Sequence, residues 1–214
     1  GAENFYTLYR CHNYHFKIYG AMFVGQPDTA LEAADELIAT LPEDFLRTMA
    51  DWFEGFIPMK QHVLIRFGRW NDILAQALPK DAELYSATTA MMRYARTVAL
   101  ANTKKLAEAE AERDLFFEAR DNVPESRTLF NNTCRDILTV AEQMLLGELE
   151  YHKGNYAKAF EHLRTSAERD DNLPYDEPWG WMQPARHALG ALLIEQGQHE
   201  EAEAVYRADL GLDD

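Results

Sequence analysis

The sequence predicts an all-α protein built from consecutive pairs of helices. Segments such as 31–41, 106–120 and 200–210 are rich in Ala, Glu, Leu and Arg, and their apolar residues recur at intervals of three and four. β-Branched residues are few, and no β-hairpin dipeptide lies between alternating apolar runs, so we expect no β-hairpin. One phrase also occurs twice near the end of the chain, which indicates a repeat architecture.

Composition limits the classes of function. The 214 residues carry a formal net charge of −15, which argues against nucleic-acid binding but is compatible with basic peptides, cationic ligands or metals. No apolar run approaches the ~20 residues needed to cross a bilayer, so we expect a soluble protein with no membrane contact. Cys11 and Cys134 lie far apart and form no metal-binding pattern, which fits a reducing compartment and predicts a cytoplasmic location.

The repeated phrase is HKGNYAKAFEHL at 152–163 and QGQHEEAEAVYRADL at 196–210. Each copy has a turn glycine, an alanine five residues later and a second glycine seven residues earlier. These residues are Gly147, Gly154 and Ala159 in the first copy, and Gly190, Gly197 and Ala202 in the second. The earlier glycine of each copy, called the inner glycine (Gly147 and Gly190), lets the first helix pack closely on the second. The turn glycine (Gly154 and Gly197) ends the first helix.

This pattern resembles the tetratricopeptide repeat (TPR). The resemblance implies a TPR-like α-solenoid of about five antiparallel helix pairs, wound into a right-handed superhelix. Weaker copies have Gly25, Gly68 and Lys104 at the turn position, and the units are longer than the family's ~34 residues. They form a single repeat domain, 1–214, with units at about 5–41, 51–78, 82–120, 128–170 and 180–210. The segments HNYH, HVLIRFGRW and WMQPARHALGALL together resemble a group of bacterial TPR proteins, which brings no established activity with it.

In TPR proteins the first helix of each unit lines a concave groove. When the family's groove positions, counted from the turn residue of each unit, are transferred to this sequence, five of the seven histidines fall in the groove. The main candidates for ligand contact, on the groove or beside it, are His12, His15, Tyr19, His62, Arg66, Tyr94, Glu148, Tyr151, His152, Arg186 and His187. The other groove positions are Met22, Phe23, Gly55, Pro58, Ile65, Met91, Val98, Ala101, Asn102, Ala141, Met144, Pro184, Ala191, Ile194 and Glu195.

The histidines leave several interpretations open. His12 and His15 share one helical face, and His62 on the next unit could supply a third ligand to one divalent metal. Glu148 or His187 could complete that shell in a tight superhelix. Otherwise the imidazoles line a wet groove, cap backbone groups or contact a peptide.

The groove arginines and the connector tryptophans also have alternative roles. Arg66, Arg93 and Arg186 could clamp a carboxylate or phosphate, or pair with acidic neighbours. Trp179 and Trp181 are expected to staple the long connector before the last unit onto the helices.

Three functions remain for comparison. No nucleophile or phosphate-binding motif is present, so we expect a non-catalytic scaffold without a cofactor that binds a protein or peptide in the concave groove. The groove list contains no lysine, which excludes the family's clamp for acidic chain ends. The alternative is a solenoid, even an enzyme, that binds a metal or small ligand through the groove histidines. The third is a spacer: no polar capping helix follows 200–210 before Asp214, so this end should self-associate or meet a further repeat.

Overall fold

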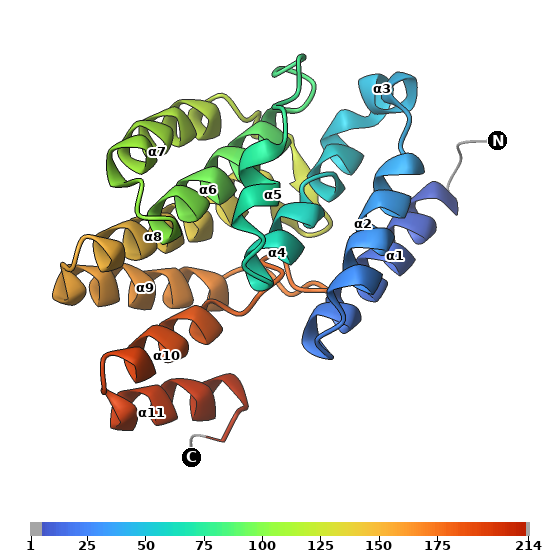
Figure 1. Ribbon diagram of the computed structural model, residues 1–214. Coiled ribbons are helices and arrows are strands. Elements are labelled where there is room, and N and C mark those ends of the chain that lie inside the picture. The colour runs from blue at the N-terminus through green and yellow to red at the C-terminus, as the bar shows by residue number, and fades with distance from the viewer. Residues whose placement is uncertain (1–5, 213–214) are drawn as a thin grey trace.

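The computed structural model describes residues 6–212, and almost all of its regular structure is helical (Figure 1). The predicted all-α class is confirmed. The start of the first predicted unit at residue 5 and the end at Asp214 lie outside the described residues. Within 6–212, no helix combines the length and the apolar character that crossing a bilayer requires. The elements are α1 (Tyr6–Phe23), α2 (Pro27–Ala39), α3 (Glu43–Phe53), the 3-10 helix η1 (Glu54–Phe56), α4 (Met59–Arg66), α5 (Trp70–Ala75), α6 (Ser86–Asn102), α7 (Leu106–Asp121), β1 (Thr128–Leu129), β2 (Asn132–Thr133), α8 (Cys134–His152), α9 (Tyr156–Asp171), α10 (Ala185–Glu195) and α11 (His199–Asp209).

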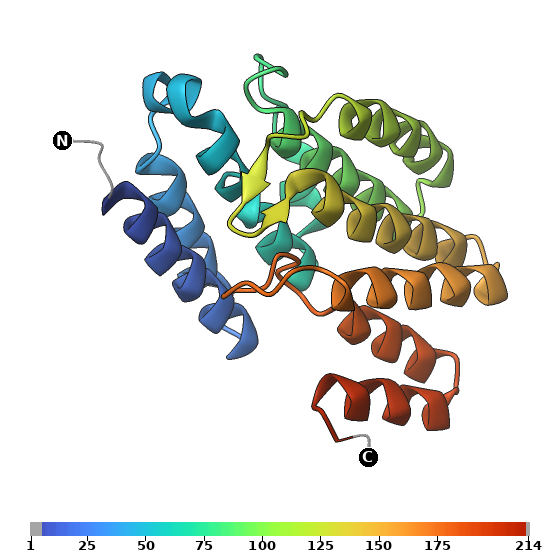
Figure 2. The same ribbon diagram turned by 180° about the vertical axis from the view of Figure 1, so that it is seen from behind.

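The helices form hairpins that stack on one another. The pairs α1–α2, α4–α5, α6–α7, α8–α9 and α10–α11 each pack internally, at the places predicted from the turn residues. The second helix of each pair also contacts the first helix of the next, as α2 does with α4 and α9 with α10 (Figures 1 and 2). Apolar faces are therefore buried between neighbouring hairpins, which is how a repeat array makes its core.

Each hairpin turns through one residue with left-handed backbone. The φ angles at these positions are +72° at Gly25, +62° at Gly68, +63° at Lys104, +85° at Gly154 and +73° at Gly197. In every case the next amide donates to the carbonyl five residues earlier, over 2.8 to 2.9 Å, as Asn155 does to Glu150. This bond satisfies a carbonyl at the end of the first helix. The expectation that Gly154 and Gly197 end their helices is confirmed.

The inner glycines permit close helix packing, as their spacing predicts. A Cβ atom on Gly147 would lie 2.6 Å from the Leu163 side chain, and one on Gly190 would lie 2.6 Å from the ring of Tyr206. Alanine at either position would therefore force α8 from α9, or α10 from α11.

The second predicted unit is more broken than expected, and α3 was not expected at all. Its first helix was placed from about residue 51, but the chain forms α3, then η1, and begins α4 only at Met59. Pro58 precedes α4 and has no amide to continue a helix from residues before it. Gly55 lies against the segment that follows α7, because a Cβ there would be 2.9 Å from the Thr128 carbonyl oxygen.

A short antiparallel β-hairpin, β1–β2, precedes α8, so the expectation of no β-hairpin was wrong. Phe130 occupies its turn with φ +50°, where hairpin rules favour glycine or asparagine. The Phe130 ring lies 5.1 Å from that of Phe56 and 5.3 Å from that of His12. We attribute the unusual turn to these contacts, which a local sequence pattern does not reveal.

A buried ion pair lies beside this hairpin. Arg127 donates to Glu54 over 3.1 Å and to the Leu84 carbonyl over 2.8 Å, and both charged side chains are almost fully buried. Glu54 also accepts from the amide of Thr88 over 2.6 Å and from that of Ala87 over 3.2 Å. The pair therefore fixes η1 to the start of α6.

Candidate functional site

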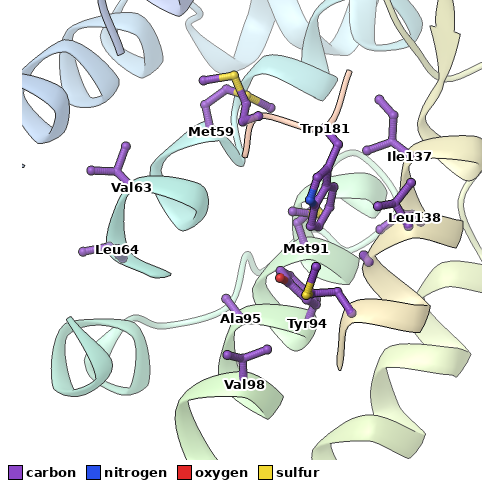
Figure 3. Packing of buried hydrophobic residues seen from close by; sticks show 14 of the residues in the cluster. Met59, Val63, Leu64, Met91, Tyr94, Ala95, Val98, Ile137, Leu138 and Trp181 are labelled. Atoms are coloured by element: carbon purple, nitrogen blue, oxygen red, sulfur yellow. The ribbon is translucent and has the colours of Figure 1, made fainter. Parts of the chain in front are cut away.

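The connector between α9 and α10, residues 172–184, fills the middle of the inner face. We use "inner face" for the side of α1, α4, α6 and α8 on which this connector lies. Trp181 is 2% exposed and packs among side chains of α4, α6 and α8, including Met59, Met91 and Ile137 (Figure 3). Next to it, Met182 is fully buried. The expected stapling of the connector is confirmed for Trp181.

The buried histidines serve this packing. His15 Nε2 lies 2.8 Å from the sulfur of Met182, and the His62 ring lies 4.8 Å from that of Trp181. Tyr94 contacts Trp181 edge-on at 5.4 Å. Burial lowers the pKa of His15 and of His62 to about 3, so both imidazoles are neutral. These groove positions are core, not an open wall.

The predicted metal site at His12, His15 and His62 does not form a ligand set. Among residues 6–212, no group of three or more His, Cys, Asp or Glu side chains is placed to hold a metal ion. The reason is the aromatic packing around the rings. His12 meets Phe16 edge-on at 4.8 Å, and the His15 ring stacks on Phe130 at 6.3 Å.

A second set of predicted groove residues lies along α8, bound to its neighbours. Glu148 lies 3.5 Å from His152 and accepts from Asn102 over 3.4 Å. Tyr151 donates to Glu195 over 2.6 Å. These residues cross-link α6, α8 and α10, and none of them lines the pocket described next.

Beside the packed connector lies an open pocket of about 460 Å³. Its walls come from the end of α1, the end of α9, the connector, the start of α10 and the end of α11. We call it the aromatic–acidic pocket, after the residues Tyr19, Phe23, Trp179, Asp170, Asp171 and Asp209. It lies where the first hairpin approaches the last, because the rings of Phe23 and His187 are only 5.7 Å apart.

Aromatic side chains form one wall of the pocket. Tyr19 and Phe23 lie one helical turn apart on α1, with ring centroids separated by 4.5 Å. Phe23 is 42% exposed and Trp179 is 45% exposed, which is unusual for such large apolar groups. The pocket therefore presents accessible ring surface.

Carboxyl groups also line the pocket. Asp170 accepts from the amide of Ala185 at the start of α10 over 2.9 Å, and burial raises its pKa to about 7. Asp171 forms a two-pronged ion pair with Arg186. His187 lies 3.0 Å from Asp209. Arg186 is thus engaged by an acid of this chain and is not a free anion clamp.

Arg66 and His187 lie at the rim of the pocket. The Arg66 guanidinium is 6.0 Å from the centre of the Phe23 ring, within range of a cation–π contact. Arg93, the third groove arginine, pairs instead with Glu112 over 2.8 Å. The acidic-neighbour interpretation of the arginines therefore holds for Arg93 and Arg186.

The structure brings together predicted residues from the two ends of the chain. Tyr19, Phe23, Pro184 and Arg186 line the pocket, whereas the sequence frame missed its three aspartates and gave Trp179 only a structural role. The adjacent Asp170 and Asp171, just before a proline-rich connector, were the available signal. The frame overlooked them because it considered only the first helix of each unit.

The two cysteines are remote from any nucleophilic role. Burial raises the pKa of Cys11 to about 11, and it raises the pKa of Cys134 still further. Both thiols therefore stay protonated at neutral pH.

Comparison with known proteins found no match for this chain, whether among protein-family models, curated proteins or solved structures.

Proposed function

We propose that the protein is a non-catalytic, TPR-like solenoid that binds a partner polypeptide in the aromatic–acidic pocket beside its inner face. Support for the solenoid comes from the left-handed turn that recurs with one hydrogen-bond pattern from Gly25 to Gly197. The hairpins also contact one another in chain order, as repeats in a right-handed superhelix do.

The observation that carries the binding role is the open pocket itself. The connector packs with Trp181 and Met182 against the middle of the inner face, yet it leaves about 460 Å³ open beside them. Ligand sites in proteins are commonly concave pockets of this size. Because the pocket lies between the first and last hairpins, a ligand bound in it would contact residues of both.

The chemistry of the buried histidines and cysteines supports binding without catalysis. His15 and His62 are neutral and enclosed, and the cysteine thiols are protonated. None of these groups faces the pocket as a base or nucleophile. The groups that do line it are suited to recognition: rings, carboxyl groups and a paired guanidinium.

A selection from a displayed random-peptide library tests this function. Peptides enriched on the wild-type protein are measured by calorimetry against Phe23→Ala, with Phe16→Ala as the matched control. Both phenylalanines lie on α1 with similar exposure, 42% and 40%, but only Phe23 lines the pocket. We expect Phe23→Ala to weaken binding roughly tenfold or more, and Phe16→Ala to leave it unchanged. Equal losses in the two variants, or no enriched peptide, would contradict the proposal.

We also propose that the α11 end of the array self-associates. Leu210 is 70% exposed and Ile194 is 48% exposed on this last hairpin. Sedimentation should show a dimer that dissociates in an Ile194→Lys/Leu210→Lys double variant. A wild-type protein that is monomeric at high concentration would refute this part.

A further inference from the structure

We infer that the aromatic–acidic pocket recognises an organic ammonium group, primary or methylated, presented by the partner as a lysine side chain. This inference rests on the proposed function and specifies the chemistry of its ligand. Three features of the pocket carry it: exposed ring faces, an excess of carboxyl groups, and an arginine that is already neutralised.

The ring faces provide the first feature. Tyr19 and Phe23 form a paired surface on α1, and Trp179 contributes a further ring from the connector. A cation within ~6 Å of an aromatic centre is attracted by the electron density of the ring face. One such contact is present at the rim of the pocket, where the guanidinium of Arg66 lies 6.0 Å from the centre of the Phe23 ring.

The charge balance provides the second feature. The pocket lining contains the carboxyl groups of Asp170, Asp171 and Asp209 against the single guanidinium of Arg186. Burial raises the pKa of Asp170 to about 7, and an ammonium group beside it would favour the ionised form. A carboxylate ligand would meet net repulsion at the same place.

The engagement of Arg186 provides the third feature. Both of its terminal nitrogens donate to the two oxygens of Asp171, which is the bidentate geometry of strong arginine–carboxylate pairs. Within the pocket this pair cancels one charge of each sign. The carboxyl groups of Asp170 and Asp209 then remain, against the guanidinium of Arg66 beside Phe23 at the rim.

Choline and its uncharged isostere 3,3-dimethylbutan-1-ol test the charge preference directly. Binding is followed by the indole N–H signals of the four tryptophans in proton–nitrogen NMR spectra. We expect choline to bind at least roughly fivefold more tightly than the alcohol, the size of a partly desolvated cation–π contact. Equal affinities would overturn the inference.

Asp171→Asn is the diagnostic variant, because it removes one negative charge and releases Arg186 into the pocket. We expect it to weaken choline binding roughly fivefold to 30-fold. The matched control is Glu201→Gln, which breaks the comparable two-pronged pair with Arg164 on another part of the surface. An Asp171→Asn protein that keeps its melting temperature and binds choline like the wild type would overturn the inference.

Further ligands identify the source of the ammonium group. A short lysine peptide should bind more tightly than the same peptide with norleucine, and more tightly than putrescine or butylamine. Preference for the free amines would reject the lysine assignment in favour of a small-molecule ligand. If library peptides bind through Phe23 but lysine and norleucine are equivalent, this inference fails while the proposed polypeptide-binding function stands.

Discussion

The sulfur of Met182 lies 2.8 Å from Nε2 of His15, although 167 residues separate them in the chain. This contact ties the connector before the last hairpin to the first helix of the array. It explains why the inner face is not an open groove along its whole length. Beside the same connector, a pocket stays open between the ends of α1 and α11.

Shortening Met182 should therefore destabilise the whole array. Met182 is fully buried, so Met182→Ala should lower the free energy of unfolding by about 2–5 kcal/mol. Met182→Leu keeps most of the volume and should cost less than about 1.5 kcal/mol. Urea unfolding measures both. Similar small losses for the two variants would mean that the connector is not part of the core.

Acid should weaken the contribution of the two buried histidines to stability, while Asp170, whose pKa burial raises to about 7, acts in the opposite sense over the same pH range. The pKa of His15 and His62 falls from 6.5 to about 3 on folding, so below pH 6.5 the unfolded chain binds protons that the folded chain does not. Their stabilising contribution is complete above pH 6.5 and decreases as the pH falls toward 3, by up to about 1.4 kcal/mol per pH unit and histidine.

Unfolding measured between pH 6.5 and 5 checks this dependence. His62→Phe should reduce the slope, whatever its effect on stability at pH 7. His199→Gln, at an exposed position, should leave the slope as in the wild type. A wild-type slope that His62→Phe does not change would contradict the assignment.

The buried pair of Glu54 and Arg127 should be strongly coupled. Arg127→Met leaves the Glu54 carboxylate without its counter-charge and should cost about 3–5 kcal/mol of stability. The double variant with Glu54→Gln also removes that charge, so it should lose clearly less than the sum of the single losses. A double-mutant cycle by chemical unfolding gives the coupling, and additive losses would show that the pair is not coupled.

Lys104 offers a stabilising change. It is the one turn position among the five predicted ones that holds a left-handed φ, +63°, without being glycine. Lys104→Gly should raise the free energy of unfolding by about 1 kcal/mol, since glycine adopts this conformation without a steric penalty. Lys17→Gly is the control: Lys17 is also exposed but lies in the middle of α1, where glycine should destabilise by about 1 kcal/mol. Thermal unfolding that ranks the two variants alike would contradict this explanation.

Local patterns were enough to predict the helix hairpins. Gly154 and Gly197 mark their turns because a left-handed residue is a local requirement, and Gly147 and Gly190 mark close packing because only a missing Cβ allows it. The β1–β2 hairpin could not be predicted, since Phe130 adopts its turn conformation among rings from distant segments.

The site was less accessible to sequence reasoning than the fold. The groove positions of regular repeats are assigned to each unit separately. That assignment does not consider that a connector can fold onto the inner face and cover these positions. His15 and His62 therefore became core, and the open pocket arose between the first and last hairpins. Asp209 and Tyr19 line one pocket although they lie at opposite ends of the chain, an approach that no local spacing encodes.

The most direct test of the account is an NMR titration with a peptide selected from the library, observed at the four tryptophan indole signals. Trp179 lines the pocket, whereas Trp52 is 65% exposed and lies outside it on α3. We expect the Trp179 signal to shift in proportion to occupancy while the Trp52 signal stays unchanged. A shift at Trp52 with none at Trp179 would place the binding surface elsewhere and contradict binding in the aromatic–acidic pocket.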